Sequence, residues 1–417
     1  KRPAPAGSVV LKQARVVTMK GDEVLERADI VVTGNRIAAL GPSGEVKVPP
    51  GSVAFDLKGM TVIPGLVDVH AHPHYSAMEI FPEKKWEYVA NLAYGVTTLH
   101  DPSAHSLDVF AEAEMVEAGE MIGPRIYSSG DVLYGGTQAA QYAKADTKEE
   151  VQQAVKRMKK YGAHWLKVYQ QPRREQRIWF VEAAREEGVG VTMEGAGELH
   201  TDLTNFMDGF TGLEHSLPVP LYKDVVTLAA KSGTAYTPTL IVSYGGPTAE
   251  LYWYQHANPH DDERLRHFVP HDMLDVLGRR RPWYPEEDFH FPTVANGAAR
   301  IAREGGRVCL GAHGQLQGLG AHWEMWSLTM GGGMTAMEAL RAATQAGAEA
   351  LGFGKDLGTV EVGKLADLAV IDGDPLADLH SSAKVVFTMK NGELYDSATM
   401  NEVWPQHKQL GRFFWTR

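Results

Sequence analysis

Cysteine and long apolar runs are almost absent from this 417-residue sequence. The single cysteine, Cys309, excludes an internal disulfide, which leaves both the cytoplasm and the periplasm open as compartments. No apolar run approaches the roughly 20 residues that a membrane-spanning helix needs. No cationic start followed by an apolar stretch indicates a signal peptide. We therefore expect a soluble protein that does not engage a membrane.

The sequence also has fewer positively charged than negatively charged side chains. The 41 lysine and arginine side chains are outnumbered by 52 aspartate and glutamate side chains, so the net charge is -11. Such a chain has no general attraction to nucleic acid or anionic lipid. Its length and its 44% hydrophobic residues suffice for one barrel plus a smaller domain. We expect a small-molecule substrate and no nucleic-acid partner.

The first residues of the sequence are typical of a linker between domains. The sequence starts at Lys1 rather than at a methionine, and Pro3 and Pro5 follow closely. Proline-rich segments commonly serve as linkers between domains. We therefore expect that the chain was cut from a longer precursor or from a fused protein.

Both ends of the chain carry short apolar runs that predict β-strands. Near the N-terminus the runs cover residues 9–11, 16–18 and 30–32. Near the C-terminus they cover residues 367–371 and 385–389, and an Asn391-Gly392 turn signal follows. Edge strands need partners and domain termini often lie close together. The economical arrangement is one composite β-sandwich built from residues 1–62 and 357–417.

Residues 63–356 alternate short apolar strands with amphipathic helices, for example at 148–161 and 221–231. This alternation is typical of parallel strands with helical crossovers. The expected strands begin near Val62, Val96, Arg125, Trp165, Gly190, Gly212, Tyr236 and Val308. Eight such units favour a closed (β/α)₈ TIM barrel of the α/β class over an open sheet.

A segment at about 244–291 interrupts the alternation after the seventh strand. Long insertions of this kind are usually functional or disordered, although an irregular packing excursion without a role in binding is an equal alternative. Its aromatic residues would suit the wall of a site for an apolar or aromatic group, or a subunit contact in a homo-oligomer. These residues are Tyr252, Trp253, Tyr254, Trp283 and Tyr284.

Side chains that bind metals stand at the ends of five predicted strands. His70 and His72 alternate at the end of the first strand, so both imidazoles face the same side and can meet one ion. Each remaining donor, taken alone, is more often structural, but together they sit where a barrel keeps its catalytic groups. The remaining donors are Lys167, Glu194, His215 and His313.

Lys167 lies within the apolar fourth strand. Burying an ammonium is costly, so such a lysine extends to solvent, pairs with a carboxylate or loses its charge. A neutral lysine can react with carbon dioxide, and the carbamate formed is an anionic oxygen ligand that can bridge two ions. A structural ion pair is the competing interpretation.

The ordered motifs resemble the amidohydrolase superfamily over nearly the whole chain, particularly its prolidase-like and imidazolonepropionase-like members. The stretch at 311–326 looks more like the subgroup often fused behind a TolB-like β-propeller. That resemblance implies an upstream β-propeller and makes an exported protein plausible. The matching segments are 63–72 (IPGLVDVHAH), 95–101 (GVTTLHD), 165–169 (WLKVY), 213–215 (LEH) and 358–368 (GTVEVGKLADL).

Two positions depart from the pattern that the resemblance implies. The family ordinarily ends strand five with a histidine ligand and strand eight with an aspartate, where this chain has Glu194 and His313. Thr192 is the alternative counterpart on strand five. The exchange leaves the ligand inventory unchanged, so we expect a rearranged working site. Our hypothesis places His70, His72 and His313 on one metal ion and Glu194 and His215 on a second, with carbamylated Lys167 as the bridge.

The resemblance implies a metal-dependent hydrolase that cleaves an amide C–N bond by attack of a metal-bound hydroxide. His313 suits proton transfer to the leaving amine, and His322 is its substitute if His313 is tied to metal. Tyr134 and Tyr169 are candidate donors to the developing oxyanion. Zinc, manganese, iron and cobalt all suit the ligand set, with zinc preferred.

The residues leave alternatives open. A deaminase, a lactonase or a phosphotriesterase could use the same scaffold, because a barrel hosts many chemistries. The two altered positions and the abrupt start also allow a catalytically silent binding domain of a larger fusion. Protein purified without chelator would then lack metal.

Overall fold

The computed structural model describes residues 3–73, 81–135, 145–169, 171–218, 220–279 and 281–416. Strands from both chain ends form one nine-stranded sheet, ordered β18-β17-β16-β15-β5-β1-β2-β3, with β4 paired to β1. The two ends join where β15 runs antiparallel to β5, with Val370 opposite Val62. The strands are β1 (Ser8–Val17), β2 (Val24–Thr33), β3 (Arg36–Pro42), β4 (Val53–Asp56), β5 (Met60–Pro64), β15 (Leu368–Asp372), β16 (Val385–Lys390), β17 (Glu393–Asp396) and β18 (Glu402–Trp404).

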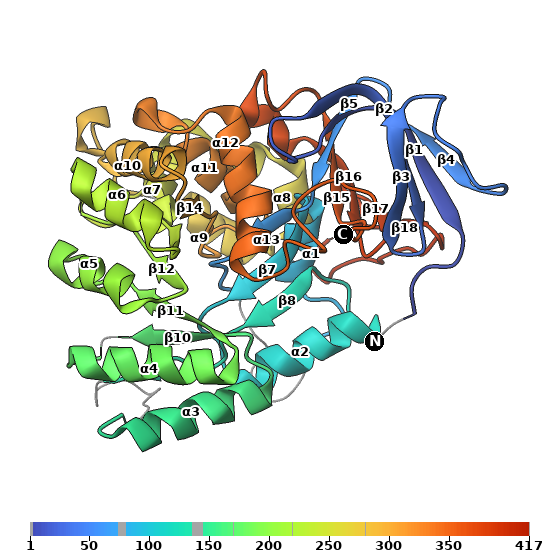
Figure 1. Cartoon of the computed structure of the whole chain (residues 1–417). Helices are drawn as coiled ribbons and strands as arrows, with labels where there is room; N and C mark the ends of the chain where they lie inside the picture. The colour runs from blue at the N-terminus through green and yellow to red at the C-terminus, as the bar shows by residue number, and fades with distance from the viewer. Residues whose placement is uncertain are drawn as a thin grey trace.

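This terminal sheet lies beside the barrel (Figure 1) and has its own hydrophobic core. Val9, Leu11 and Ile30 come from the N-terminal strands, and Leu368 and Met389 come from the C-terminal ones. All five side chains are fully buried. The alternating runs at the two ends of the sequence therefore supply the two halves of a single apolar cluster, as the sequence pattern predicts.

Eight parallel strands form the barrel, in two hydrogen-bonded sheets. The backbone N–H of Val69 donates to Leu310 O at 3.0 Å, and that of His164 donates to Ser128 O at 3.4 Å, which links the sheets at both seams. A short strand, β9 (Leu133–Tyr134), pairs with β10. The barrel strands are β6 (Leu66–Asp68), β7 (Val96–Asp101), β8 (Arg125–Ser128), β10 (Trp165–Tyr169), β11 (Gly190–Glu194), β12 (Gly212–Glu214), β13 (Ala235–Thr237) and β14 (Arg307–Val308).

The first barrel strand begins later than the sequence pattern suggests. Val62 lies on β5 of the terminal sheet, and the barrel starts only after Gly65. The Gly65 N–H donates to Asp367 O of the terminal sheet, whereas the next N–H donates to Gly95 O beside the barrel. A Cβ at Gly65 would lie 2.1 Å from Thr97 Oγ1, so a glycine is needed where the chain changes sheets. A single apolar run in the sequence thus contributes β5 to the terminal sheet and β6 to the barrel.

Helices surround the barrel strands (Figure 1). α3 coincides with the predicted helix, because Thr147 and Glu150 form a capping box at its start and Gly162, at φ 113°, ends it. The helices outside the insertion are α1 (Trp86–Ala93), α2 (Ser106–Ala118), α3 (Lys148–Tyr161), α4 (Arg174–Glu187), α5 (Leu199–Asp208), α6 (Lys223–Lys231), α10 (Phe291–Arg303), α11 (Leu319–Ser327), α12 (Ala336–Arg341) and α13 (Gly347–Ala350).

The insertion after β13 contains three short helices, α7 (Ala249–His256), α8 (Glu263–Phe268) and α9 (His271–Gly278). Arg264 of α8 donates hydrogen bonds to Ala93 O, Ala383 O and Val385 O. The insertion is therefore a helical unit fastened to both α1 and the terminal sheet.

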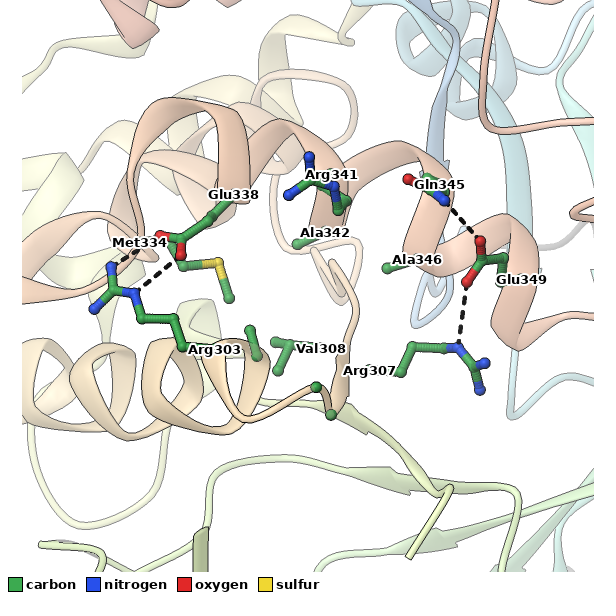
Figure 2. A pocket seen from close by; sticks show the side chains of 13 residues that line it. Arg303, Arg307, Val308, Met334, Glu338, Arg341, Ala342, Gln345, Ala346 and Glu349 are labelled. Atoms are coloured by element: carbon green, nitrogen blue, oxygen red, sulfur yellow. Dashed lines mark hydrogen bonds and ion pairs between the residues drawn. The ribbon is translucent and has the colours of Figure 1, made fainter. Parts of the chain in front are cut away.

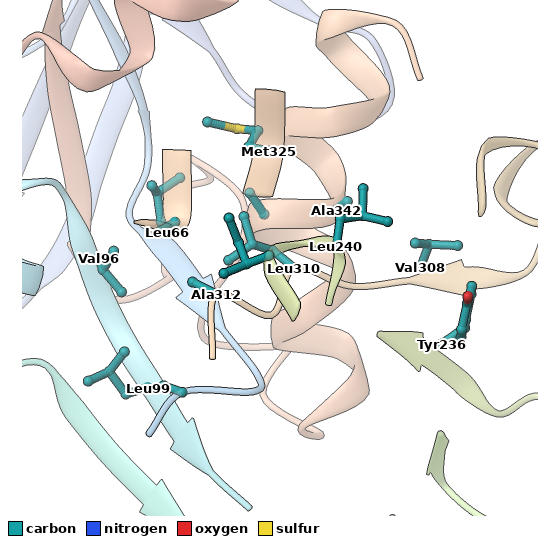
Figure 3. Packing of buried hydrophobic residues seen from close by; sticks show 14 of the residues in the cluster. Leu66, Val96, Leu99, Tyr236, Leu240, Val308, Leu310, Ala312, Met325 and Ala342 are labelled. Carbon is teal, nitrogen blue, oxygen red and sulfur yellow. The ribbon is translucent and has the colours of Figure 1, made fainter. Parts of the chain in front are cut away.

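Apolar side chains close the barrel interior around the first and last strands. Leu66, Leu99 and Leu310 are almost completely buried there, and Tyr236 of β13 belongs to the same cluster (Figure 3). Side chains from widely separated strands pack together only when the sheet is closed. Among the described residues, no helix is long and apolar enough to cross a membrane.

Candidate metal centre

Four histidine rings meet at the carboxyl ends of the barrel strands. His70 and His72 follow β6, His215 follows β12, and His313 follows β14. The His70 ring centroid lies 4.9 Å from that of His72, 4.8 Å from that of His215 and 4.9 Å from that of His313. Residues 243 positions apart in the sequence (313 − 70) therefore share one cluster.

The donor nitrogens lie close enough to share an ion. One ring nitrogen from each of His70, His215 and His313 lies within 4.8 Å of the other two. His70 Nε2 and His215 Nδ1 are buried without a hydrogen-bond partner. Burial and the neighbouring Lys167 hold the pKa of His70 well below its ordinary value, so its imidazole is neutral. Neutral imidazoles with free lone pairs fit a divalent metal ion.

Acidic side chains behind the rings fix the orientation of two histidines. His70 Nδ1 lies 3.1 Å from Glu214 Oε2 and 3.1 Å from Thr239 Oγ1. Because the Thr239 hydroxyl itself donates to Thr237 O, it accepts from His70, and the proton belongs on Nδ1. His72 Nδ1 lies 3.0 Å from Asp101 Oδ1. Such contacts select the tautomer whose Nε2 carries the lone pair.

Lys167 and Glu194 complete the predicted ligand set. Lys167 Nζ lies 2.6 Å from Glu194 Oε2, and His215 Nε2 lies 2.9 Å from Glu194 Oε1. Burial alone would raise the pKa of Glu194, but Lys167 and His215 hold it well below its ordinary value. The structure thus brings all six predicted donors together and places a Lys167–Glu194 ion pair in their midst.

Two strand-end histidines have a left-handed backbone. φ is 68° at His215 and 59° at His313, a region that residues other than glycine seldom adopt. The His313 N–H donates to His70 O at 2.7 Å, which ties the end of β14 to the end of β6. Backbone strain of this kind is typical of functional sites. The left-handed conformation of these two residues turns the chain sharply after β12 and after β14.

Tyrosine hydroxyls lie beside the cluster. Tyr169 donates to Glu194 Oε1 at 3.4 Å and Tyr244 donates to the same atom at 3.2 Å. Tyr134 stacks on Tyr169 with ring centroids 4.8 Å apart, and Tyr244 stacks on His215 at 5.0 Å. Sequence reasoning missed Tyr244 as a site residue. Its position just after the seventh strand was the available signal.

His322 is not part of the cluster, and its predicted role as substitute base is wrong. The ring is fully buried, Nε2 donates to Tyr94 O at 2.9 Å, and Nδ1 accepts from Ser382 Oγ at 2.9 Å. Burial lowers the pKa of His322 to about 4. Because both nitrogens are engaged, this histidine joins α11 to neighbouring elements and has no nitrogen left to move a proton.

A cavity of about 600 Å³ opens beside the cluster, with His72 and His313 in its wall. Val269, Met273 and Leu277 of the insertion also line it. The predicted aromatic wall is therefore wrong for the described part of the cavity: Trp253 is instead buried, with its Nε1 donating to Ser327 Oγ, and Trp283 is 73% exposed. The insertion supplies an aliphatic wall.

A second cavity, of about 380 Å³, lies at the amino end of β14, where Arg307 begins the strand (Figure 2). Its charged side chains are all paired, Arg303 with Glu338 at 2.8 Å, Arg307 with Glu349 at 3.9 Å, and Arg341 with Asp22 outside the cavity at 2.6 Å. Barrel enzymes keep their active sites at the carboxyl ends of the strands. The cavity at the opposite end is therefore not the reaction site.

A (β/α)₈ barrel with imidazole donors at its strand ends defines the class of metal-dependent barrel hydrolases. The amidohydrolase family model matches residues 61–395, so the chain belongs to the amidohydrolase family. The predicted activity class, a metal-dependent hydrolase of amide carbon-nitrogen bonds, is thereby confirmed.

Known proteins share the architecture at low sequence identity. An imidazolonepropionase from Sphingopyxis alaskensis is 24% identical over 396 residues, covering 87% of this chain and 91% of the relative. The structure of a Xaa-Pro dipeptidase with bound methionine aligns with a TM-score of 0.72 and 22% identity, over 94% of this chain and all of the other (100%). A putative prolidase from Bifidobacterium longum aligns with a TM-score of 0.72 and 23% identity, over 99% of this chain and 97% of the other. These alignments confirm the predicted barrel.

Proposed function

We propose that this protein hydrolyses the amide bond of a small peptide-like or cyclic amide at a divalent-metal centre. One observation carries the proposal: four histidine rings, Lys167 and Glu194 converge at the carboxyl ends of the barrel strands. The names of similar proteins, an imidazolonepropionase and prolidases, support a carbon-nitrogen substrate.

The centre we propose holds two ions. His70, His72 and His313 would bind the first, and Glu194 and His215 the second, with carbamylated Lys167 between them. The imidazole and carboxylate donors suit zinc, and also manganese, iron or cobalt. The contact between Lys167 Nζ and Glu194 Oε2 keeps both side chains at the same point. It is also the ion pair of the competing interpretation, which carbamylation of Lys167 would have to break.

A bound divalent cation supplies Lewis-acid polarisation of a carbonyl and lowers the pKa of water. The protein's own groups perform the remaining tasks. The hydroxyls of Tyr169 and Tyr244, now on Glu194, are placed to donate hydrogen bonds to an oxygen that gains negative charge. Tyr134 holds the Tyr169 ring by stacking. His313 lines the cavity and serves either as the third ligand of the first ion or as the group that delivers a proton to the departing nitrogen, because a ring tied to metal cannot do both.

The first experiment compares substrate classes. Protein purified without chelator is analysed for metal and assayed with dipeptides, N-acyl amino acids and cyclic amides, alongside lactones, phosphotriesters and aminopurines. We expect bound divalent metal and turnover of amides only. Faster turnover of a lactone, a phosphotriester or an aminopurine contradicts the proposal, and metal-free, inactive protein points to a silent binding domain.

A second experiment tests His313. We expect His313→Asn to lose at least about 100-fold in turnover, the scale of a lost general acid or base. His200→Asn is the matched control, because His200 is exposed on α5. Metal content measured in both variants separates a lost ligand from a lost proton carrier. Near-normal turnover in His313→Asn rules out the assigned role.

A further inference from the structure

The cavity beside the metal cluster is chemically asymmetric. His72 and His313 of the cluster contribute imidazoles to its lining. Along the wall lie the aliphatic side chains of Val269, Met273 and Leu277. Val269 is fully buried, and Met273 and Leu277 are half-buried, so an apolar ligand group can cover their remaining surface.

Glu250 adds a carboxylate to this wall. It belongs to α7 of the insertion, lines the cavity and is only 9% exposed. Arg281 Nη1 lies 3.6 Å from Glu250 Oε1, but Arg281 does not line the cavity, and its guanidinium is stacked over the Tyr254 ring at 3.5 Å from the centroid. Among the described residues, the cation that pairs with this carboxylate therefore approaches it from behind the wall.

The negative charge of Glu250 is incompletely balanced. Burial raises the pKa of Glu250 although Arg281 and a hydrogen bond from Gln315 oppose the shift. Asp101, the other acid in the wall, is engaged by His72 Nδ1 and by the Ser103 N–H. Among the described residues that line the cavity there is neither lysine nor arginine. A cationic ligand group is favoured beside Glu250, and an anionic one is repelled.

We propose that this cavity binds the amine-bearing aliphatic half of the substrate, with a primary ammonium on Glu250 and an alkyl chain against Val269, Met273 and Leu277. The inference rests on the proposed amide hydrolysis and narrows it to amides of unblocked aliphatic amino acids. Glu250 is the residue that determines this specificity. The insertion after β13 therefore selects the substrate, while the strand ends carry the chemistry.

Binding of a matched ligand pair tests the inference without turnover. Calorimetry measures 3-methylbutylamine and its neutral counterpart 3-methylbutanol on the metal-loaded wild-type protein and on Glu250→Gln. We expect the amine to bind the wild type more tightly than the alcohol. In Glu250→Gln the amine should lose about tenfold in affinity, the scale of one charge-assisted hydrogen bond, and the alcohol should not change.

Two further variants serve as controls. Glu263→Gln removes a carboxylate from α8 whose side chain is 92% exposed, and it should leave both ligands unaffected. Leu277→Ala should weaken the amine and the alcohol alike, because both carry the same alkyl chain. Equal wild-type affinity for the two ligands, or a loss in Glu250→Gln that is the same for both, overturns the inference.

Hydrolysis separates this inference from the proposed function. Leucine p-nitroanilide is compared with its N-acetyl derivative, which keeps the scissile amide and removes the ammonium. We expect the anilide with the free amine to be hydrolysed faster than its N-acetyl derivative. Glu250→Gln should reduce this difference in hydrolysis rate. Equal hydrolysis of both anilides overturns the specificity but leaves amide hydrolysis standing. If the protein hydrolyses no amide but binds the amine as expected, the proposed hydrolysis is overturned and the amine site at Glu250 stands.

Discussion

His72 Nδ1 and Asp101 Oδ1 lie 3.0 Å apart, so a carboxylate at the end of β7 sets the orientation of a ring that follows β6. Asp101 Oδ1 also accepts from the Ser103 N–H at 2.8 Å, which fixes the carboxylate itself. Partners of this kind orient metal ligands and raise their basicity. Asp101 is a positioning residue rather than a ligand in this arrangement.

Asp101→Asn should therefore weaken metal binding without removing a ligand. We expect metal affinity to fall about 10- to 100-fold, the usual cost of losing an outer partner of a ligating histidine. Competition with a fluorescent chelator measures this affinity. Asp224→Asn, exposed in the first turn of α6, is the control. Unchanged affinity in Asp101→Asn would show that His72 needs no such support.

Lys167→Ala should abolish amide hydrolysis and deplete bound metal. The substitution removes the bridge of the proposed two-ion centre and leaves Glu194 without the cation that now balances it. Elemental analysis and carbon-13 NMR of bicarbonate-labelled wild type test ligation and carbamate formation separately. Lys159→Ala, on the exposed side of α3, is the control. Full metal occupancy in Lys167→Ala contradicts the bridging role.

Tyr244→Phe should reduce turnover while metal content stays normal. The hydroxyl donates to Glu194 Oε1, beside the cluster, and the ring keeps its stacking on His215 after the change. Loss of one oxyanion donor typically costs about 100- to 1000-fold in kcat. Steady-state kinetics with a dipeptide shows whether the loss falls on kcat, as we expect, or on KM. An effect confined to KM would assign Tyr244 to substrate binding.

His322→Ala should destabilise the fold and spare the chemistry. It removes the donor to Tyr94 O and the acceptor of the Ser382 hydroxyl proton, although Trp326 Nε1 still donates to Ser382 Oγ. An unsatisfied buried polar group costs about 1–3 kcal/mol, so the midpoint of urea unfolding should fall. Activity per metal-loaded molecule should match the wild type at low temperature. A catalytic defect in stable, fully loaded protein would restore the discarded role as base.

Lys390 should make the stability depend on pH. Burial lowers the pKa of Lys390 from 10.5 to about 8, with Arg125 adding to the shift and Asp367 and Glu393 opposing it. Between these values the unfolded chain binds more protons than the folded one, so stability rises as the pH increases from about 8 to 10.5. Below pH 8 the full penalty, on the order of 3 kcal/mol, is present.

Lys390→Met should remove this penalty and its pH dependence. We expect the variant to be more stable than the wild type at pH 7 and to lose much of that advantage at pH 9.5. Urea unfolding at both pH values measures the difference. Lys384→Met, before β16, is the surface control. A variant that is less stable than the wild type at pH 7 would mean that the attraction of Lys390 to Asp367 and Glu393 stabilises the fold by more than the burial of its charge destabilises it.

The strand ends and their donors are readable from the sequence, because a period of two places His70 and His72 on one side and parallel strands present their carboxyl ends at one rim. The sequence also suffices to predict that the β segments at the two ends of the chain join. The predicted homo-oligomer, upstream β-propeller and compartment stay predictions.

Local pattern by itself determined the barrel and the terminal sheet of this protein, and it indicated six candidate donors, which as metal ligands stay a prediction. Only the tertiary structure decided which side chains stand behind and beside those donors. His322 resembles a site histidine in the sequence, yet α11 turns its ring toward Tyr94 and Ser382. Tyr244 and Glu250 reach the centre and its cavity because the insertion folds back over the barrel rim. Such contacts join distant segments, and no local periodicity specifies them.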